Sequence, residues 1–273
     1  MSDIDGTLLG ADGKVAASDL EAIQKLLKRG IPVTLCTGRM YSGTRTIARD
    51  LGLTDPVACI DGSHIVDLTT NRQLASSPLT GGGVSALLEE LDQHQPAAFV
   101  FSGDRVYFDN PGRGYLPYVA TWSEEKEELS AVLDPSHWHA ERPIAALVAL
   151  GTEAQIGGVH EAIRLRHESL LQSVCFPVRH AAHEGVWGMV VRAAKVDKGT
   201  AIEWLASHYG ITPEEIVVVG DWLNDIPMLK RAGRSFAMAQ APDEVKAAAT
   251  DVLEADIWRG GGLAEAAVRS GLL

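Results

Sequence analysis

Short apolar runs that alternate with helical patterns limit both ends of this chain to one kind of sheet. Near the N-terminus, Ile31–Cys36 and Val57–Ile60 predict buried strands, with a helix before the first and another between the two. The pattern returns near residue 199, and the most β-branched run, Ile216–Val219, ends at Gly220-Asp221. Strands that are apolar throughout are typical of a parallel sheet with helices on both faces. We therefore expect an α/β fold with a Rossmann-like, doubly wound parallel sheet.

Helix start signals support this interpretation. Ser18 and Glu21 form a Ser-x-x-Glu capping box, which apolar residues at helical spacing and Gly30 follow. A second box lies in Thr212–Glu215, with proline at the first helical position. The remaining elements expected here are helices at about 199–209 and 243–249 and strands at 235–238 and 251–253.

The middle of the chain has a different pattern. In Phe99–Phe108 a turn signal lies between aromatic and β-branched residues, which predicts a hairpin. We expect further strands at 144–150, 173–178 and 186–191 and a helix near 153–169. The acidic stretch Ser123–Glu128 is predicted to be a solvated face. The expected organisation is thus a catalytic core, residues 1–80 and 192–273, with an inserted α+β cap domain, residues 81–191.

Charge and composition limit the classes of function. Lys and Arg number 24 and Asp and Glu 36, a net charge of −12, which argues against a general binder of nucleic acid or of anionic membranes. No apolar stretch is long enough to span a bilayer, and the N-terminus lacks the pattern of a signal peptide. Three scattered cysteines fit neither a disulfide framework nor a zinc cluster. We expect a cytoplasmic protein, a monomer or homodimer, without nucleic-acid or membrane partners.

Two groups of carboxylates follow predicted strands. Asp3 and Asp5 are two residues apart, so they leave a strand on the same side and repel each other unless a cation lies between them or one is protonated. Asp221 and Asp225 follow the strand Ile216–Val219, and ligands bind outside the carboxyl ends of strands in open α/β sheets. Such an oxygen-rich site favours Mg²⁺. Each group alone also fits an ordinary polar turn or helix cap.

Two further patterns fit an oxyanion. Thr37-Gly38-Arg39 follows a predicted buried strand with a hydroxyl, an accessible backbone N–H and a cation. Lys198 precedes a predicted helix, where its ammonium could neutralise a phosphate beside carboxylates. Taken alone, the first pattern also simply ends a strand, and the lysine also fits an ordinary surface position.

The order of these four patterns resembles the four motifs of the haloacid dehalogenase superfamily of phosphotransferases. More closely, the chain is similar to the Cof-type phosphatases, which carry a large α+β cap between the second and third motifs. The resemblance covers nearly the whole chain and extends to Ala241–Lys246 and to the glycine-rich segment Gly260–Leu263.

This resemblance implies a Mg²⁺-dependent phosphoric monoester hydrolase that acts on a small phosphorylated metabolite, such as a sugar phosphate. The implied catalytic residues are the nucleophile Asp3, the acid and base Asp5, and Thr37 and Lys198. The implied phosphate-binding residues are Gly38, Arg39 and Asn224. The implied metal site comprises Asp3, Asp5 through its carbonyl, Asp221, and Asp225 as a group that orients the metal's waters or Lys198.

Three departures from the family pattern stand out. Only Met1 and Ser2 precede Asp3, where the family has about five apolar residues, so we expect a shortened first strand and a start assigned too late or a trimmed chain. Asp61 stands where the family often has asparagine, and Lys195 where it usually has glycine. In the cap, the candidates for substrate contact are His183, Glu184, Trp187, Arg179 and Tyr107, although an ordinary place in the folded surface, or in the cap core for Trp187, is the simpler interpretation of each.

Other functions remain open at this stage. A phosphomutase or phosphotransferase of the same fold differs only in that a second substrate hydroxyl replaces water. A dehalogenase is disfavoured, because its chemistry does not need Asp5. A phospho-accepting signalling module of the receiver type shares the residue types, but it is about half this length and lacks the insert. A catalytically silent binding protein has no feature of the sequence in its favour.

Overall fold

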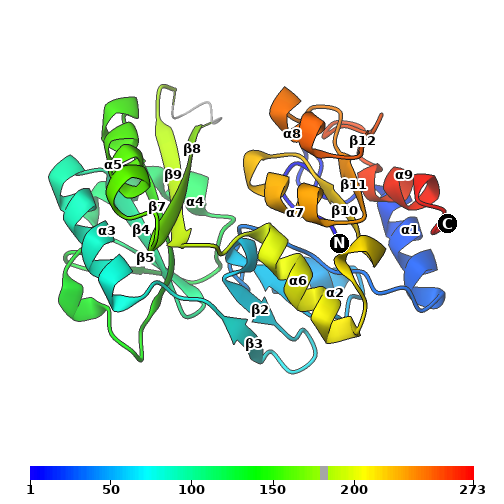
Figure 1. Cartoon of the computed structure of the whole chain (residues 1–273), viewed down its shortest axis with the longest axis horizontal. Helices are drawn as coiled ribbons and strands as arrows, with labels where there is room; N and C mark the ends of the chain where they lie inside the picture. Colours follow the sequence, from blue (N-terminus) through cyan, green and yellow to red (C-terminus); the bar gives the residue numbers. More distant parts are fainter. Residues whose placement is uncertain (179–183) are drawn as a thin grey trace. The chain divides into compact units, whose positions relative to one another are not determined.

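The computed structural model describes residues 1–178 and 184–273, which divide into two compact units. Unit 1 comprises Met1–Gly38, Arg45–Ala75 and Asp197–Leu273, and unit 2 comprises Arg39–Thr44 and Ser76–Val196. The ends of the chain therefore meet in one unit and the middle forms the other (Figure 1). The division falls after residues 75 and 196, where the sequence analysis expected it after residues 80 and 191, and residues 39–44 go with unit 2.

The sheet of unit 1 is parallel through its centre. Strands β10 (Val217–Gly220), β11 (Arg234–Ala237) and β12 (Asp251–Val252) pair in parallel in that order. On the other side of β10, Ser2 forms parallel bridges to Val219 and to Leu35. The next parallel bridge joins Cys36 to Ala58 of β1 (Val57–Cys59), which pairs antiparallel with β2 (His64–Val66), and β3 (Gln73–Ser76) completes that edge. The predicted α/β fold with a parallel sheet is confirmed.

Alternate residues of the strands face two different layers of helices. Val218 packs into a core with residues of α6 (Lys198–Tyr209), α7 (Ile226–Arg231) and α8 (Asp243–Ala248). Its neighbour Val219 packs into a separate core with Phe236 and with Ala266 of α9 (Gly262–Arg269). The sheet is thus covered on both faces, which is why its strands are apolar throughout. A short helix, α2 (Arg45–Asp50), precedes β1.

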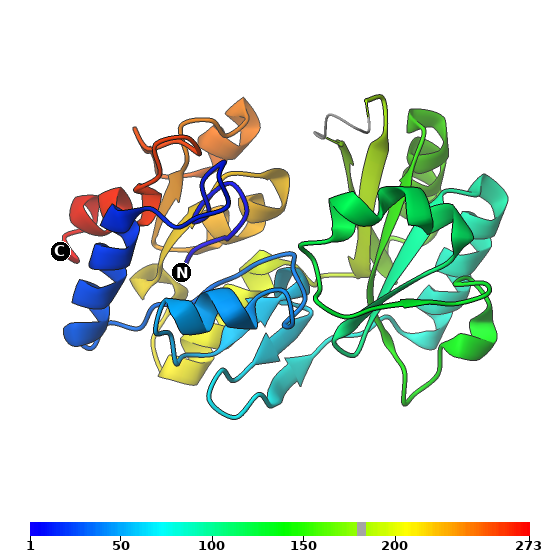
Figure 2. The ribbon, with the colours of Figure 1, turned by 180° about the vertical axis from the view of Figure 1, so that it is seen from behind.

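The start of α1 (Ala17–Lys28) differs from the prediction. The helix begins before Ser18, its N-cap is Ala16 without a side-chain cap, and the predicted capping box is therefore wrong. Instead, the fully buried Asp19 accepts hydrogen bonds of 2.9 Å from the backbone N–H groups of Gly261 and Ala264, at the start of α9. Figure 2 shows α1 and α9 side by side. A tertiary contact has replaced the local one.

The second predicted box forms, but its helix does not continue. Thr212 and Glu215 make reciprocal bonds around a single 3₁₀ turn, Pro213–Glu215, and β10 begins two residues later. By contrast, α6 ends at Gly210 in the left-handed conformation, as predicted.

Unit 2 is built on a six-stranded sheet with the order β6-β5-β4-β7-β9-β8. The strands are β4 (Ala97–Ser102), β5 (Arg105–Phe108), β6 (Lys126–Glu128), β7 (Ile144–Gly151), β8 (Leu171–Pro177) and β9 (Trp187–Ala193). The predicted hairpin is β4–β5, and only β5–β6 is a parallel pair among the pairs described. Helices α3 (Gly81–His94) and α5 (Glu153–Arg166) pack their apolar residues into one core with this sheet, and α4 (Leu116–Val119) is short. The described helices are all too short or too polar to span a bilayer.

The acidic stretch of unit 2 is not simply a solvated face. Lys126–Glu128 forms the edge strand β6, and Arg105 of β5 holds Glu127 through an ion pair of 2.5 Å. Ser123, at the start of the stretch, is fully buried and its hydroxyl lies 2.8 Å from that of Ser42. Charge pairing with the neighbouring strand therefore lets an acidic sequence serve as a strand.

Beside Met1, unit 1 contains an apolar cavity of about 330 Å³. Its lining is mostly aliphatic and includes Met1, Leu26, Leu205 and Leu263. The Met1 ammonium donates a hydrogen bond of 2.7 Å to the Val217 carbonyl, and burial lowers its pKa to about 6. Ser2 thus lies between β10 and Leu35 in the sheet, and the cavity is next to Met1.

Candidate active site

The ends of three neighbouring parallel strands supply the polar residues of unit 1. Asp3 follows the bridge residue Ser2, Thr37 follows Cys36, and Asp221 follows β10. Because the carboxyl ends of parallel strands meet at one edge of a sheet, the sheet brings these predicted site residues together. Asp3 and Thr37 are both buried, with 5 % and 1 % of their surface exposed.

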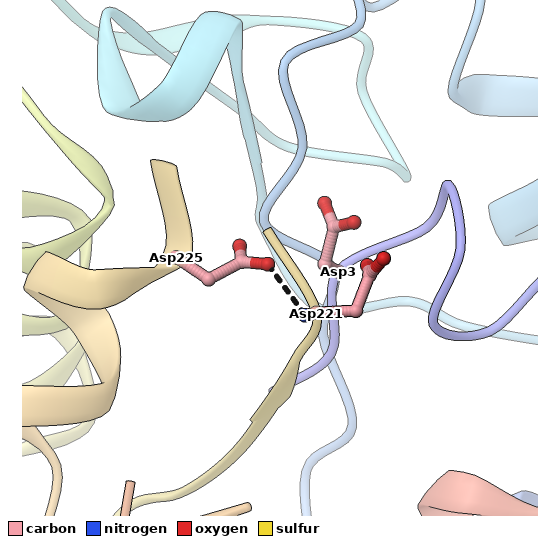
Figure 3. Close-up of side chains that lie close together, drawn as sticks. All are labelled: Asp3, Asp221 and Asp225. Atoms are coloured by element: carbon pink, nitrogen blue, oxygen red, sulfur yellow. Dashed lines mark hydrogen bonds between the residues drawn. The ribbon is translucent and has the colours of Figure 1, made fainter. Parts of the chain in front are cut away.

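Three carboxylates form the centre of the site. Oxygens of Asp3, Asp221 and Asp225 lie within 4.8 Å of one another, and all three residues are buried (Figure 3). Asp225 ends the 3₁₀ turn Leu223–Asp225, and its Oδ2 accepts hydrogen bonds from the N–H groups of Asp221 and Trp222 at 2.8 and 2.9 Å. These bonds hold the turn that follows β10 against the sheet edge.

Lys198 is fully buried beside these carboxylates. It is the first residue of α6, and Asp197 caps that helix by accepting bonds from two of its N–H groups. The Lys198 Nζ lies 2.5 Å from Asp3 Oδ1 and 2.6 Å from Asp225 Oδ1. Burial opposes the charged form, but the carboxylates of Asp225 and Asp3 outweigh it and hold the pKa of Lys198 well above its usual value. The ammonium is therefore a permanent positive charge.

The carboxylates outnumber this one cation. Burial, together with the neighbouring charges of Asp225 and Asp221, raises the pKa of Asp3 well above its usual value, although Lys198 opposes the rise. Burial and the charge of Asp225 raise the pKa of Asp221 to about 7, although a bond of 2.7 Å from the Thr7 hydroxyl lowers it. A further cation at this point would let both carboxylates keep their charge.

The donor atoms fit a divalent metal ion. Oxygens of buried carboxylates are the ligands that hard cations prefer. Both oxygens of Asp225 already accept bonds from Lys198 and the backbone, so Asp3 and Asp221 are the better placed ligands. Gly6 makes room for this arrangement, because its φ is +83° and an added Cβ would lie 2.4 Å from Asp221 Oδ2. A side chain at position 6 would displace the Asp221 carboxylate.

The other predicted residues lie at different places. Asp5 is exposed and does not belong to the carboxylate group. Gly38 lies against Asp61, and Asn224 donates a hydrogen bond of 2.7 Å to the Asp61 carboxylate. Arg39 belongs to unit 2, where its guanidinium donates to the Gly43 carbonyl at 3.2 Å. The structure thus groups Asp3, Asp221 and Asp225 beside Lys198, places Gly38 and Asn224 next to Asp61, and leaves Asp5 exposed.

The contacts of two residues in this region, Gln240 and Asp61, were not foreseen. Gln240 donates a hydrogen bond of 2.7 Å to the Gly6 carbonyl and accepts one of 3.1 Å from the Ile257 N–H. Asp61 was noted only as a departure from the family pattern, yet it contacts Asn224 and lies 3.8 Å from the Lys198 Nζ. None of these contacts has a local sequence signal, because the partners are far apart in the chain.

The cap residues named from the sequence have varied surroundings. Tyr107 and Trp187 pack into the core of unit 2, with Tyr107 against the Trp138 ring. Glu184 is exposed. Arg179 and His183 lie outside the described residues.

Comparison with known proteins agrees with this fold. The family of haloacid dehalogenase-like hydrolases matches residues 1–260. The pyridoxal phosphate phosphatase YbhA of Escherichia coli is 27 % identical over 92 % of this chain and 91 % of its own length. The 5-amino-6-(5-phospho-D-ribitylamino)uracil phosphatase YwtE of Bacillus subtilis is 25 % identical over 93 % and 92 % of the two chains. A solved haloacid dehalogenase-like hydrolase from B. subtilis has a TM-score of 0.82 and 22 % sequence identity, and the match covers 100 % of this chain and 99 % of that chain.

The chain belongs to the haloacid dehalogenase-like hydrolases, and within them it groups with the Cof-type phosphatases. It is therefore an enzyme of a family that uses a metal ion in catalysis, and the buried oxygen ligands of Asp3 and Asp221 suit that requirement.

Proposed function

We propose that this enzyme is a Mg²⁺-dependent phosphatase that hydrolyses a small phosphorylated metabolite through an aspartyl-phosphate on Asp3. The observation that carries the proposal is the buried group of Asp3, Asp221 and Asp225 around Lys198, at the carboxyl ends of parallel strands. A buried carboxylate next to a fixed ammonium and a metal site is equipped to attack an anionic phosphoryl group, because those cations offset the repulsion between nucleophile and phosphate.

Asp3 and Asp5 divide the chemistry between them. A carboxylate oxygen of Asp3 attacks phosphorus, the bond from phosphorus to the leaving oxygen breaks, and Asp5 donates a proton to that oxygen. Water then attacks the phosphorus of the aspartyl-phosphate and gives its proton to Asp5. The bond from phosphorus to Asp3 breaks, and inorganic phosphate leaves. The different surroundings of the two residues suit these roles, because Asp3 is buried beside Lys198 and Asp5 is exposed, where it can exchange protons with water.

The remaining residues hold the metal and the phosphoryl oxygens. Asp3, Asp221 and the Asp5 carbonyl would hold Mg²⁺, which lowers the negative charge on the transferring phosphoryl group when bound. Asp225 positions Lys198 through its bond of 2.6 Å. The phosphoryl oxygens are held by the Thr37 hydroxyl, the Gly38 N–H, Lys198 and Asn224, with Arg39 as an additional cation for phosphate or substrate.

We assign the choice of leaving group to unit 2, the inserted α+β cap. The phosphate site uses residues that any phosphomonoester would engage, so it cannot by itself select a metabolite. The relatives support a small phosphorylated substrate, since their names include a pyridoxal phosphate phosphatase and a phosphoribitylaminouracil phosphatase. A sugar phosphatase is among the proteins with the same fold.

A screen of phosphorylated metabolites tests this function. The purified enzyme with Mg²⁺ is expected to release inorganic phosphate from at least one phosphomonoester of the panel, and phosphate release is the measurement. A bisphosphate activator in parallel reactions detects a phosphomutase, which would move the phosphoryl group to a second hydroxyl. Transfer without release would contradict the phosphatase assignment.

A further inference from the structure

The turn between β1 and β2 has an unusual backbone. Three consecutive residues, Ile60, Asp61 and Gly62, have φ values of +52°, +50° and +97°. The left-handed region suits glycine, but it is rare for a β-branched residue such as isoleucine. Each such non-glycine residue persists only where the surrounding structure holds it.

Two neighbouring segments of unit 1 hold this turn. The Asp61 N–H donates a hydrogen bond of 2.9 Å to the Thr37 carbonyl. An added Cβ at Gly62 would lie 2.7 Å from the Asp197 carbonyl, so the turn lies directly against the start of α6. The strained backbone is therefore fixed between the residue that follows Cys36 and the residue that precedes Lys198.

This position brings the Asp61 carboxylate among the candidate phosphate-binding groups. Asp61 is 3 % exposed. Its Oδ1 accepts a hydrogen bond of 2.7 Å from Asn224 Nδ2 and lies 3.8 Å from the Lys198 Nζ. An added Cβ at Gly38 would lie 3.6 Å from the same oxygen. One carboxylate thus lies next to three of the groups that the proposed function assigns to the phosphoryl oxygens.

The buried Asp61 carboxylate must be stabilised by its neighbours, because a buried charge is costly unless it is paired and hydrogen-bonded. Asn224 and Lys198 supply that pairing. The bond from Asn224 fixes the direction of an amide that has two N–H donors, and the charge of Asp61 attracts Lys198, whose closest partners are Asp3 and Asp225.

We propose that Asp61 is a positioning residue of the phosphate site, which aims Asn224 and Lys198 at the phosphoryl oxygens before the substrate binds. This inference rests on the proposed function, and it assigns Asp61 a role that acts through its neighbours. The oxygen that accepts the bond from Asn224 carries most of this effect, because Lys198 lies 3.8 Å away and is held more closely by Asp3 and Asp225, so an amide oxygen at the same place should serve nearly as well. The alternative role for Asp61 is that its negative charge only repels phosphate.

The test is the binding of inorganic phosphate in the presence of Mg²⁺, measured by calorimetry for the wild type, D61N and D61A. Loss of one oriented hydrogen bond predicts about tenfold weaker phosphate binding for D61A. D61N keeps an acceptor for Asn224 and is expected within about threefold of the wild type. With a phosphomonoester substrate, misplacement of the binding groups predicts a drop in kcat/KM of about 100-fold for D61A and a much smaller one for D61N.

Two results would overturn the inference. If D61A binds phosphate as the wild type does, Asp61 is only a turn residue. If D61N and D61A both bind phosphate more tightly, its charge acts by repulsion. D19N is the matched control, because Asp19 is also a buried carboxylate of unit 1 but caps α9, so it should affect the melting temperature and leave phosphate affinity unchanged.

A double-mutant cycle keeps the test decisive if D61A folds poorly. If Asp61 acts through Asn224, D61S, which removes the carboxylate that accepts the bond from Asn224, should change phosphate affinity less in an N224A background than in the wild type, and strict additivity would contradict the proposal. A wild type that neither binds phosphate nor releases it from any substrate would refute the proposed function and this inference together. A wild type that does both, with an unaffected D61A, would refute the inference alone.

Discussion

The hydroxyl of Thr7 donates a hydrogen bond of 2.7 Å to the Asp221 carboxylate, across 214 positions of the chain. This bond joins the loop that follows Asp3 to the end of β10, and it favours the charged form of a carboxylate that burial would otherwise neutralise. We expect T7V to weaken Mg²⁺ binding about tenfold, because loss of a bond to a ligand typically costs 10- to 100-fold in metal affinity. T7S keeps the hydroxyl and should bind the metal normally. Calorimetry with Mg²⁺ measures the difference, and equal affinities for T7V and T7S would contradict this role for Thr7.

D3N should abolish phosphatase activity and leave the fold intact. The carboxamide has the same shape as the carboxylate but cannot form the aspartyl-phosphate, and loss of a covalent step costs several orders of magnitude. Phosphate release and circular dichroism measure the two effects. D12N is the control, because Asp12 is exposed in the loop of Gly10–Lys14. Residual turnover above about 1 % of the wild type would remove Asp3 from the role of nucleophile.

Activity should depend on Mg²⁺. EDTA is expected to stop phosphate release, added Mg²⁺ to restore it, and Ca²⁺ to replace it poorly, because Ca²⁺ takes more ligands at longer distances than compact octahedral Mg²⁺. Steady-state rates in metal-free buffer with each ion check this. Full activity in excess chelator would show that Asp3 and Asp221 work without a metal.

The contribution of His64 to the free energy of unfolding should fall as the pH drops below 6.5, while the raised pKa values of Asp3 and Asp221 act in the opposite direction. This histidine of β2 is 7 % exposed, and burial lowers its pKa from 6.5 to about 4. Between these values the unfolded state binds more protons, so the contribution is complete above pH 6.5 and decreases toward pH 4. The full difference corresponds to about 3 kcal/mol in the free energy of unfolding. Urea unfolding at several pH values measures it, and the wild type should lose stability relative to H64Q as the pH falls from 6.5 to about 4. Parallel curves for the two proteins would exclude His64 as a source.

Three apolar residues added ahead of Met1 should stabilise unit 1. The cavity of about 330 Å³ beside Met1 has an aliphatic lining that such residues could cover. Burial of an apolar side chain contributes about 1.5–3 kcal/mol, and a gain of about 3 kcal/mol raises the melting midpoint by several degrees in a chain of this size. A serine-glycine-serine extension is the control, since it moves the Met1 ammonium without adding apolar surface. Equal midpoints for both variants would show that the cavity is not a strand site. The Mg²⁺ requirement should stay the same, because Asp3 lies at the other end of the strand.

The sequence predicted most of the fold because its main signals are local. The strand β10, the α6 stop at Gly210 and the β4–β5 hairpin follow from patterns within about ten residues, and all are present. The predicted strand Ile31–Cys36 is reduced to single parallel bridges at Leu35 and Cys36. The predictions that failed are those in which a distant partner decides the outcome. The predicted capping box at the start of α1 does not form, and Asp19 of this helix caps α9 instead. Part of the acidic segment forms the edge strand β6, where Arg105 pairs with Glu127.

The same distinction applies to the site. Thr37 and Asp221 could be named because each follows an apolar run, and Asp3 because it stands two residues before Asp5, whereas Asp61 depends on a turn whose conformation no local pattern indicates. One Asp225 oxygen accepts a hydrogen bond from Lys198 and the other accepts bonds from backbone N–H groups. This arrangement could not be foreseen either, because it depends on how the turn after β10 folds back on the sheet.

The separation in sequence between Asp3 and Lys198, 195 positions, has a consequence for synthesis on the ribosome. Unit 2 is nearly continuous in sequence, so its sheet can form while the last third of the chain is still being made. Ser2 cannot find its partner on β10, and Lys198 cannot reach Asp3, until residues beyond 217 have left the exit tunnel. Unit 2 can therefore fold before unit 1 is complete, and the buried ion pairs of the candidate active site form only near the end of translation.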